Sequence, residues 1–318
     1  MSSSRRDRIR ADLTLAIVAI IWGTAFVAQR KGNELVGPFT FNAVRFLVGG
    51  LVLLPLLAWQ RTRDRTTASL QPAPPGSAKA WRGGALLGLI LFGGASLQQL
   101  GLVTTTAGKG GFITGLYVVI VPLLLAVFWQ TRVAPSSWIG ATLAVVGLLF
   151  LSINLGETLQ LNPGDGWVLL GAFVWALHVI VMGRVAPGQD PVRLAIAQYA
   201  VCALLCAVSA AVLEWGMWDN IWAATPSILY AGIMSTGLAY TLQIVGQRHA
   251  PPADAAIIMS MEAVFAALAG WLILNEQMTT RQVLGCALMF AGMLLAQLPH
   301  LVPARAKPKD VAHPPAPP

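Results

Sequence analysis

Three ionisable side chains lie inside long apolar stretches of this sequence: Arg45, His178 and Glu262. Glu262 stands within MSMEAVFAALAGW and has no lysine or arginine within ten positions on either side. An ionisable group inside a membrane helix costs about 3 kcal/mol on insertion scales, so such groups usually mark a polar site. A carboxylate here could bind a polar substrate or carry a proton.

Amide and aromatic side chains accompany these groups in the same apolar stretches. We expect them to line a water-filled cavity between helices, because polar groups inside a membrane face protein or water rather than lipid. The predicted substrate-binding residues are Trp22, Asn42, Arg45, Gln98, Tyr117, Trp175, His178, Gln198, Gln243 and Glu262.

Two of these residues also have a purely structural interpretation. Glu262 could hold helices together as a buried hydrogen-bonded acid, with Arg45 as a candidate partner. His178 could simply bond to a neighbouring helix, as a lone histidine often does. The sequence leaves both interpretations open.

The apolar surplus of the chain predicts a polytopic membrane protein. Hydrophobic residues make up 56% of the 318 residues and charged residues 11%, whereas soluble domains carry about 25% charged residues. A membrane-spanning helix needs roughly 20 mainly apolar residues. The sequence predicts an all-α fold with ten transmembrane helices, at 13–29, 38–59, 83–103, 110–129, 137–153, 166–183, 192–213, 222–246, 254–274 and 282–298.

The distribution of positive charge predicts the orientation of these helices. Of the 21 lysines and arginines, 16 fall in segments on one side of the predicted helices, four on the other, and Arg45 within a helix. Because positive residues concentrate in cytoplasmic segments, we expect both termini in the cytoplasm and a multi-pass protein of the cell (cytoplasmic) membrane. The net charge of +8 is then explained by these orienting residues, and we expect no nucleic-acid partner.

The two halves of the chain resemble each other at fixed offsets. Shifting by 153 residues brings Trp22 onto Trp175 and Pro38 onto Pro191, and shifting by 145 brings Leu97-Gln98 onto Leu242-Gln243. Five predicted helices per half is an odd number, so the second half enters the membrane inverted. Inverted repeats are typical of secondary transporters. They predict domains at 12–153 and 154–298, followed by a disordered cytoplasmic tail at 299–318.

Other function classes lack their motifs in this chain. The four histidines are scattered, and neither H-E-x-x-H nor G-x-S-x-G occurs, so we expect no enzyme and no metal site. The absence of G-x-x-x-x-G-K-[ST] argues against ATP-driven transport by this chain alone. A membrane-embedded enzyme and a non-transporting receptor or scaffold remain the alternatives.

Two stretches carry a resemblance to a known family. AAIIMSMEAVFAALAGWLILNEQMTTRQVLGCALMFAGMLLAQ, from Ala255 to Gln297, and TTTAGKGGFITGLYVVIVPLLL, from Thr104 to Leu125, resemble the EamA-like drug/metabolite transporter superfamily. The resemblance covers about residues 12–298. It departs at Ala263, where the family often has proline.

The resemblance implies a carrier, usually an exporter, of amino acids, other metabolites or toxic compounds that works without a bound cofactor. We therefore expect an exporter of small metabolites acting by alternating access. Its expected partners are a small-molecule substrate and the lipid bilayer, with the proton as a candidate coupling ion. Monomer and homodimer are both compatible with the sequence.

Overall fold

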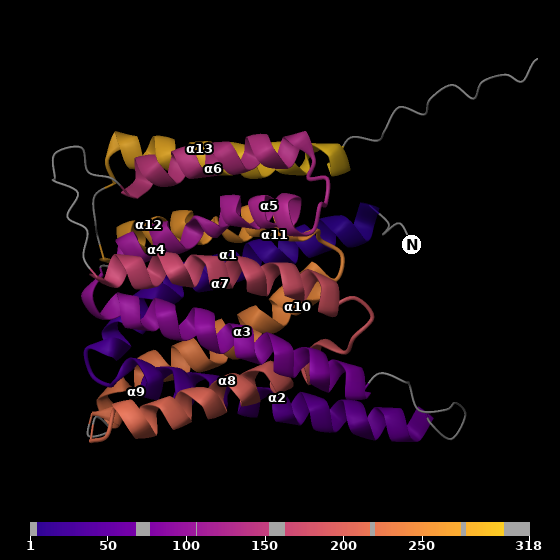
Figure 1. The fold of residues 1–318 in the computed structure, drawn as a ribbon, viewed down its shortest axis with the longest axis vertical. Helices are drawn as coiled ribbons and strands as arrows, with labels where there is room; N and C mark the ends of the chain where they lie inside the picture. The colour runs from indigo at the N-terminus through magenta and orange to yellow at the C-terminus, as the bar shows by residue number, and fades with distance from the viewer. Residues whose placement is uncertain are drawn as a thin grey trace, which may run out of the picture.

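The chain forms a bundle of helices that lie side by side, as Figure 1 shows for the computed structural model. The structure describes residues 5–67, 77–105, 107–152, 163–216, 220–274 and 278–301, and this part contains no β-strand. The first half comprises α1 (Arg5–Asn33), α2 (Pro38–Thr67), α3 (Ser77–Thr104), α4 (Ala107–Gly115), α5 (Tyr117–Phe128) and α6 (Pro135–Ser152). The second half comprises α7 (Pro163–Val185), α8 (Pro191–Leu213), α9 (Ile221–Leu229), the π-helix η1 (Tyr230–Tyr240), α10 (Thr241–Gln247), α11 (Pro252–Met259), α12 (Glu262–Leu274) and α13 (Thr280–Leu301).

Seven helical segments of the described residues are long and apolar enough to cross a membrane. They are 5–33, 38–60, 78–104, 110–128, 163–185, 191–213 and 221–247, and shorter apolar helices lie at 135–150 and 280–296. The predicted range 254–274 is helical but divided between α11 and α12. The helix α13 continues to Leu301, into the range predicted as a tail, and residues 302–318 lie outside the described part.

Two helices are broken at related places. The Leu116 N–H donates to the Ile113 carbonyl at 3.2 Å between α4 and α5, and the Met261 N–H donates to the Ile258 carbonyl at 3.1 Å between α11 and α12. Both bonds span three residues instead of four, which tightens the helix locally. Neither break lies at a proline, since α5 runs through Pro122 and α11 begins at Pro252.

The pair α6 and α13 packs along one edge of the bundle (Figure 1). A Cβ on Gly140 would lie 2.6 Å from the Gly292 carbonyl oxygen, and a Cβ on Gly147 would lie 2.6 Å from the Gly285 oxygen. Only glycine permits such close backbone approach at a helix crossing. These four glycines therefore set the distance between the two helices.

The start of α2 is capped by a residue from the other half of the chain. The buried Glu214 carboxylate, just after α8, accepts hydrogen bonds from the backbone N–H groups of Phe39 and Thr40 and from the Thr40 hydroxyl, all at 2.7 Å. A Cβ on Gly37 would lie 2.2 Å from this carboxylate. The start of α8 is instead capped by its own Asp190. Glu214 thus joins α2 to α8 and satisfies the first turn of α2.

Candidate functional site

A cavity in the middle of the bundle contains most of the predicted site residues. It is bordered by side chains from α1, α2, α3, α4, α5, α7, η1, α10, α11 and α12. The lining residues are Trp22, Phe26, Gln29, Arg45, Gln98, Thr114, Tyr117, Trp175, Val179, Ser235, Tyr240, Gln243, Met259 and Glu262. Seven of the ten predicted residues are in this set. Asn42, His178 and Gln198 are not.

The acidic part of the cavity is built at the two helix breaks. Tyr117 is the first residue of α5 and Glu262 the first residue of α12, so both side chains follow a tightened turn. The Tyr117 hydroxyl lies beside the Glu262 carboxylate without the geometry of a hydrogen bond. Tyr117 Oη and Glu262 Oε1 are both buried and make no hydrogen bond within the described residues. Two polar atoms are therefore available to a ligand or a proton.

The cation of the cavity is Arg45, which is 2% exposed. Its Nε donates to Asn42 Oδ1 at 2.8 Å, and its guanidinium carbon lies 4.7 Å from the Phe46 ring centroid and 5.8 Å from that of Phe41. These contacts place Asn42 behind Arg45 rather than in the cavity. Arg45 and Glu262 form no ion pair in the described part of the chain, so the pairing considered from the sequence is absent from this structure.

Tyr240 is the centre of an aromatic cluster on the cavity wall. Its ring centroid lies 4.7 Å from that of Trp22 and 6.1 Å from that of Trp175, the latter in a stacked arrangement. Tyr199 and His178 pack edge-on against it at 6.4 and 6.3 Å. Aromatic faces carry negative charge density and attract cations, so the cluster favours a ligand with an ammonium group.

The segment before Tyr240 has an unusual backbone. Residues Tyr230–Tyr240 form the π-helix η1, in which residues five apart lie on nearly the same face. Ser235 and Tyr240 are five apart and both line the cavity, whereas in an α-helix they would be separated by about 140° around the axis. Trp22 Nε1 donates to the Ser235 carbonyl at 3.3 Å and Tyr199 Oη to the Thr236 carbonyl at 2.9 Å. These two bonds hold η1 from outside.

Amide side chains connect the cavity wall in two short chains of hydrogen bonds. Trp175 Nε1 donates to Gln98 Oε1 at 2.8 Å, and Gln98 Nε2 donates to Gln29 Oε1 at 3.2 Å. Elsewhere on the wall Gln243 Nε2 donates to Gln247 Oε1 at 2.9 Å, while Gln243 Oε1 has no bond among the described residues. The first chain of bonds fixes the orientation of the Trp175 ring. The second leaves Gln243 Oε1 available as a hydrogen-bond acceptor.

His178 and Gln198 form a buried pair behind the aromatic cluster. His178 Nε2 and Gln198 Oε1 are 3.3 Å apart, and both residues are fully buried. Gln198 lies on α8, and no lining residue within the described part comes from that helix. The two side chains bond to each other and are not among the cavity-lining residues: α8 packs against α2 and α3, and His178 points from α7 toward Gln198.

The residues that the sequence did not single out are mostly neutral. Phe26, Gln29, Thr114, Val179, Ser235, Tyr240 and Met259 carry no charge that distinguishes them from other residues of membrane helices. A partial signal exists for Gln29, which follows Trp22 by seven residues and so lies on the same helix face. Tyr240 carries none, because its position depends on the π-helix.

The cavity is small in this structure. About 40 Å³ of its volume is accessible to water, and one water molecule needs roughly 10–15 Å³ by such a measure. A metabolite would therefore require the surrounding helices to separate.

Comparison with known proteins agrees with this architecture. The EamA-like transporter family matches the chain twice, at residues 9–153 and 162–298. An uncharacterized transporter of Archaeoglobus fulgidus is 30% identical over 92% of this chain and 87% of its own length. The threonine/homoserine exporter RhtA of Escherichia coli K12 is 27% identical over 94% of this chain and 95% of its own. A crystal structure with a TM-score of 0.73 and 19% identity, covering 92% of this chain and 98% of that one, shares the fold.

These matches extend over nearly the entire chain, and a transporter family implies a small-molecule substrate. The seven long apolar helices of the described residues make the chain a multi-pass membrane protein. The chain belongs to the EamA-like transporter family.

Proposed function

We propose that this protein is a secondary transporter that exports small polar or amphipathic metabolites, such as amino acids, by alternating access. The observation that carries the proposal is the presence of Arg45 and Glu262 in one cavity without an ion pair between them. Two opposite charges held apart match a substrate that carries both a carboxylate and an ammonium group. The Tyr240 aromatic cluster supports binding of the ammonium end.

The proposed architecture is ten membrane-spanning helices in two inverted repeats, 12–153 and 154–298. The two helix breaks support it, because Ile113 and Leu116 become Ile258 and Met261 when shifted by 145 residues. The glycine contacts of α6 and α13 support it independently. The same shift turns Gly140 into Gly285 and Gly147 into Gly292, and each glycine contacts the counterpart of the other. A two-fold axis exchanges positions in this way.

The proposed binding residues are the ten that the sequence indicates, in two groups. Trp22, Arg45, Gln98, Tyr117, Trp175, Gln243 and Glu262 would contact the substrate directly, since they line the cavity. Asn42, His178 and Gln198 would act indirectly, through Arg45 and through the rings of Trp175 and Tyr240. We further propose that both termini are cytoplasmic and that the proton is the coupling ion, with Glu262 as its carrier.

Transport by the purified protein can be measured directly in liposomes. We suggest full-length protein in liposomes loaded with radiolabelled threonine or homoserine, because a relative is a named exporter of these compounds. Release above that of empty liposomes, and faster release with an opposing proton gradient, would support the proposal. If a panel of amino acids and related metabolites gives no protein-dependent flux, transport is refuted and a membrane enzyme, receptor or scaffold becomes the better explanation.

The orientation needs a separate measurement. A single cysteine introduced at Arg132 should react with an impermeant maleimide only from the cytoplasmic face, and one at Asn220 only from the outer face. The opposite pattern would reverse the proposed topology.

A further inference from the structure

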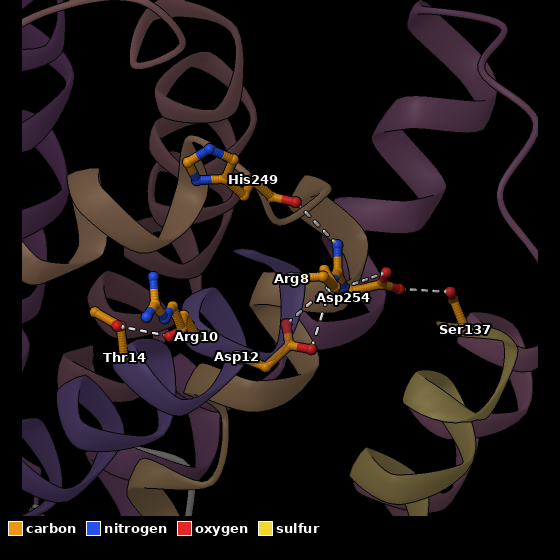
Figure 2. Close-up of polar contacts among 7 residues, drawn as sticks. All are labelled: Arg8, Arg10, Asp12, Thr14, Ser137, His249 and Asp254. Carbon is orange, nitrogen blue, oxygen red and sulfur yellow. Dashed lines mark hydrogen bonds and ion pairs between the residues drawn. The ribbon is translucent and has the colours of Figure 1, made fainter. Parts of the chain in front are cut away.

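A buried cluster of charged groups joins three helices at the end of the bundle where α1 begins. We call Arg8, Asp12, Ser137 and Asp254 the Arg8 cluster (Figure 2). The side chains of Arg8 and Asp254 are 6% and 5% exposed, and Arg8 Nη2 lies 2.8 Å from Asp254 Oδ2. Arg8 Nε lies 3.1 Å from Asp12 Oδ1. One arginine thus lies between a carboxylate of its own helix and one of α11.

Two further bonds extend the cluster to neighbouring elements. Ser137 Oγ, in the first turn of α6, donates to Asp254 Oδ1 at 2.8 Å. Arg8 Nη1 donates to the His249 carbonyl, in the connection between α10 and α11, at 3.4 Å. The cluster therefore ties α1 to α6 and α11, as Figure 2 shows.

Two of these helices, α1 and α11, border the cavity further along their length. Arg8, Leu15, Trp22 and Gln29 follow one another at intervals of seven residues, so they lie on one face of α1. Trp22 and Gln29 line the cavity, and Leu15 is fully buried between them and Arg8. On α11, Asp254 precedes Met259, which also lines the cavity, and Glu262 follows at the start of α12. Two helices that the cluster joins, α1 and α11, therefore extend from the cavity to this end of the bundle and contact each other.

We propose that the Arg8 cluster is a gate that closes this end of the cavity and must separate when the transporter opens here. A buried ion pair is favourable only while its geometry is kept. When α1 and α11 move apart, the hydrogen bonds between Arg8 and α11 are lost, and water hydrates the Arg8 and Asp254 side chains separately. The cluster therefore stabilises the closed conformation selectively, and weakening it shifts the population toward the open one.

This inference rests on the proposed alternating access, but its test requires no substrate. In a full-length background with Cys202, Cys206 and Cys286 replaced by alanine, a reporter is introduced as Leu15→Cys. Its rate of reaction with a maleimide is then measured in detergent. We expect Arg8→Gln to raise this rate by at least about fivefold, because bonds to charged groups are lost from the closed state only.

Two controls separate gating from general loosening. Arg10→Gln removes an exposed arginine from the same turn of α1 and should leave the rate within about twofold of the unmodified background. A second reporter, Gln99→Cys, lies buried at the opposite end of the cavity, where Gln99 Nε2 donates to Asn33 Oδ1. Its rate should not rise in Arg8→Gln.

A charge exchange gives the reciprocal test. Arg8→Asp combined with Asp254→Arg keeps one cation between two carboxylates and should return the Leu15→Cys rate toward that of the background. If Arg8→Gln does not fold, Asp254→Asn replaces it, since it keeps the shape and removes one charge. The proposal is overturned if the Leu15→Cys rate is unchanged in the folded variant, or if both reporters become reactive together. Failure of the liposome assay alongside a selective rise at Leu15→Cys would refute the proposed transport but not the role of the Arg8 cluster in closing this end of the cavity.

Discussion

Replacement of Glu262 by glutamine separates a binding role from a structural role. Glu262→Gln keeps the size of the side chain and removes its charge. Glu262 Oε1 has no hydrogen bond within the described residues, and the adjacent Tyr117 hydroxyl can accept a bond from the new amide. Few native contacts are lost, so we expect the free energy of unfolding to change by less than about 1 kcal/mol.

The effect on transport should be much larger. A hydrogen bond to a charged group contributes about 1.5–3 kcal/mol. If the substrate ammonium group binds Glu262 in the rate-determining conformation, its loss lowers kcat/KM about ten- to hundredfold, at 1.4 kcal/mol per factor of ten. The liposome assay measures this ratio, and intrinsic tryptophan fluorescence during heating measures stability in parallel.

Two results would refute this reasoning. Wild-type transport in Glu262→Gln would remove the carboxylate from substrate binding and proton coupling. A collapse of thermal stability would instead show that Glu262 holds α12 against its neighbours. Thr114→Val is a suitable control, because it changes another lining residue without changing charge.

Three other substitutions test the parts of the fold that support the site. Glu214→Ala should lower the free energy of unfolding by about 2–4 kcal/mol, because three donors at the start of α2, including the Thr40 hydroxyl, lose a charged acceptor. Glu214→Gln should lower it less. Equal decreases in the two variants would contradict the capping role. Gly292→Leu should lower the melting temperature markedly, since the backbone of Gly140 occupies the required space, and an unchanged value would show that α6 and α13 separate easily. Tyr199→Phe should alter substrate selectivity while the protein stays folded, because η1 loses one external bond; unaltered KM values for several amino acids would exclude this role.

The helices of this protein are largely predictable from hydropathy, because long apolar runs leave few alternatives in a membrane. The positions of the breaks are not. Pro122 and Pro252 suggest interruptions, yet the chain breaks at Leu116 and Met261. Ala263, where the family often has proline, follows the second break. The turn there is maintained by the bonds between Met261 and Ile258 and by surrounding packing, which no local residue preference announces.

Charged members of the site are visible in the sequence because an ionisable group stands out among apolar residues. Their partners are not visible. Arg45 pairs with Asn42 on its own helix rather than with Glu262, since α2 and α12 approach the cavity from different sides. Tyr240 became central only because Trp22 and Tyr199 bind carbonyls of η1, and such tertiary bonds cannot be read from one segment.

The two halves differ at three positions that line the cavity. Under the same offsets Glu262 corresponds to Tyr117, Arg45 to Gln198, and Tyr240 to Ala95. The π-helical segment likewise has its counterpart in a regular stretch of α3. In the proposed mechanism, the repeated scaffold would supply two exchangeable conformations, whereas an asymmetric substrate would require one acid, one base and one aromatic face. We therefore expect that restoring symmetry with Tyr117→Glu abolishes transport, because a second buried carboxylate beside Glu262 would raise the free energy of the charged site.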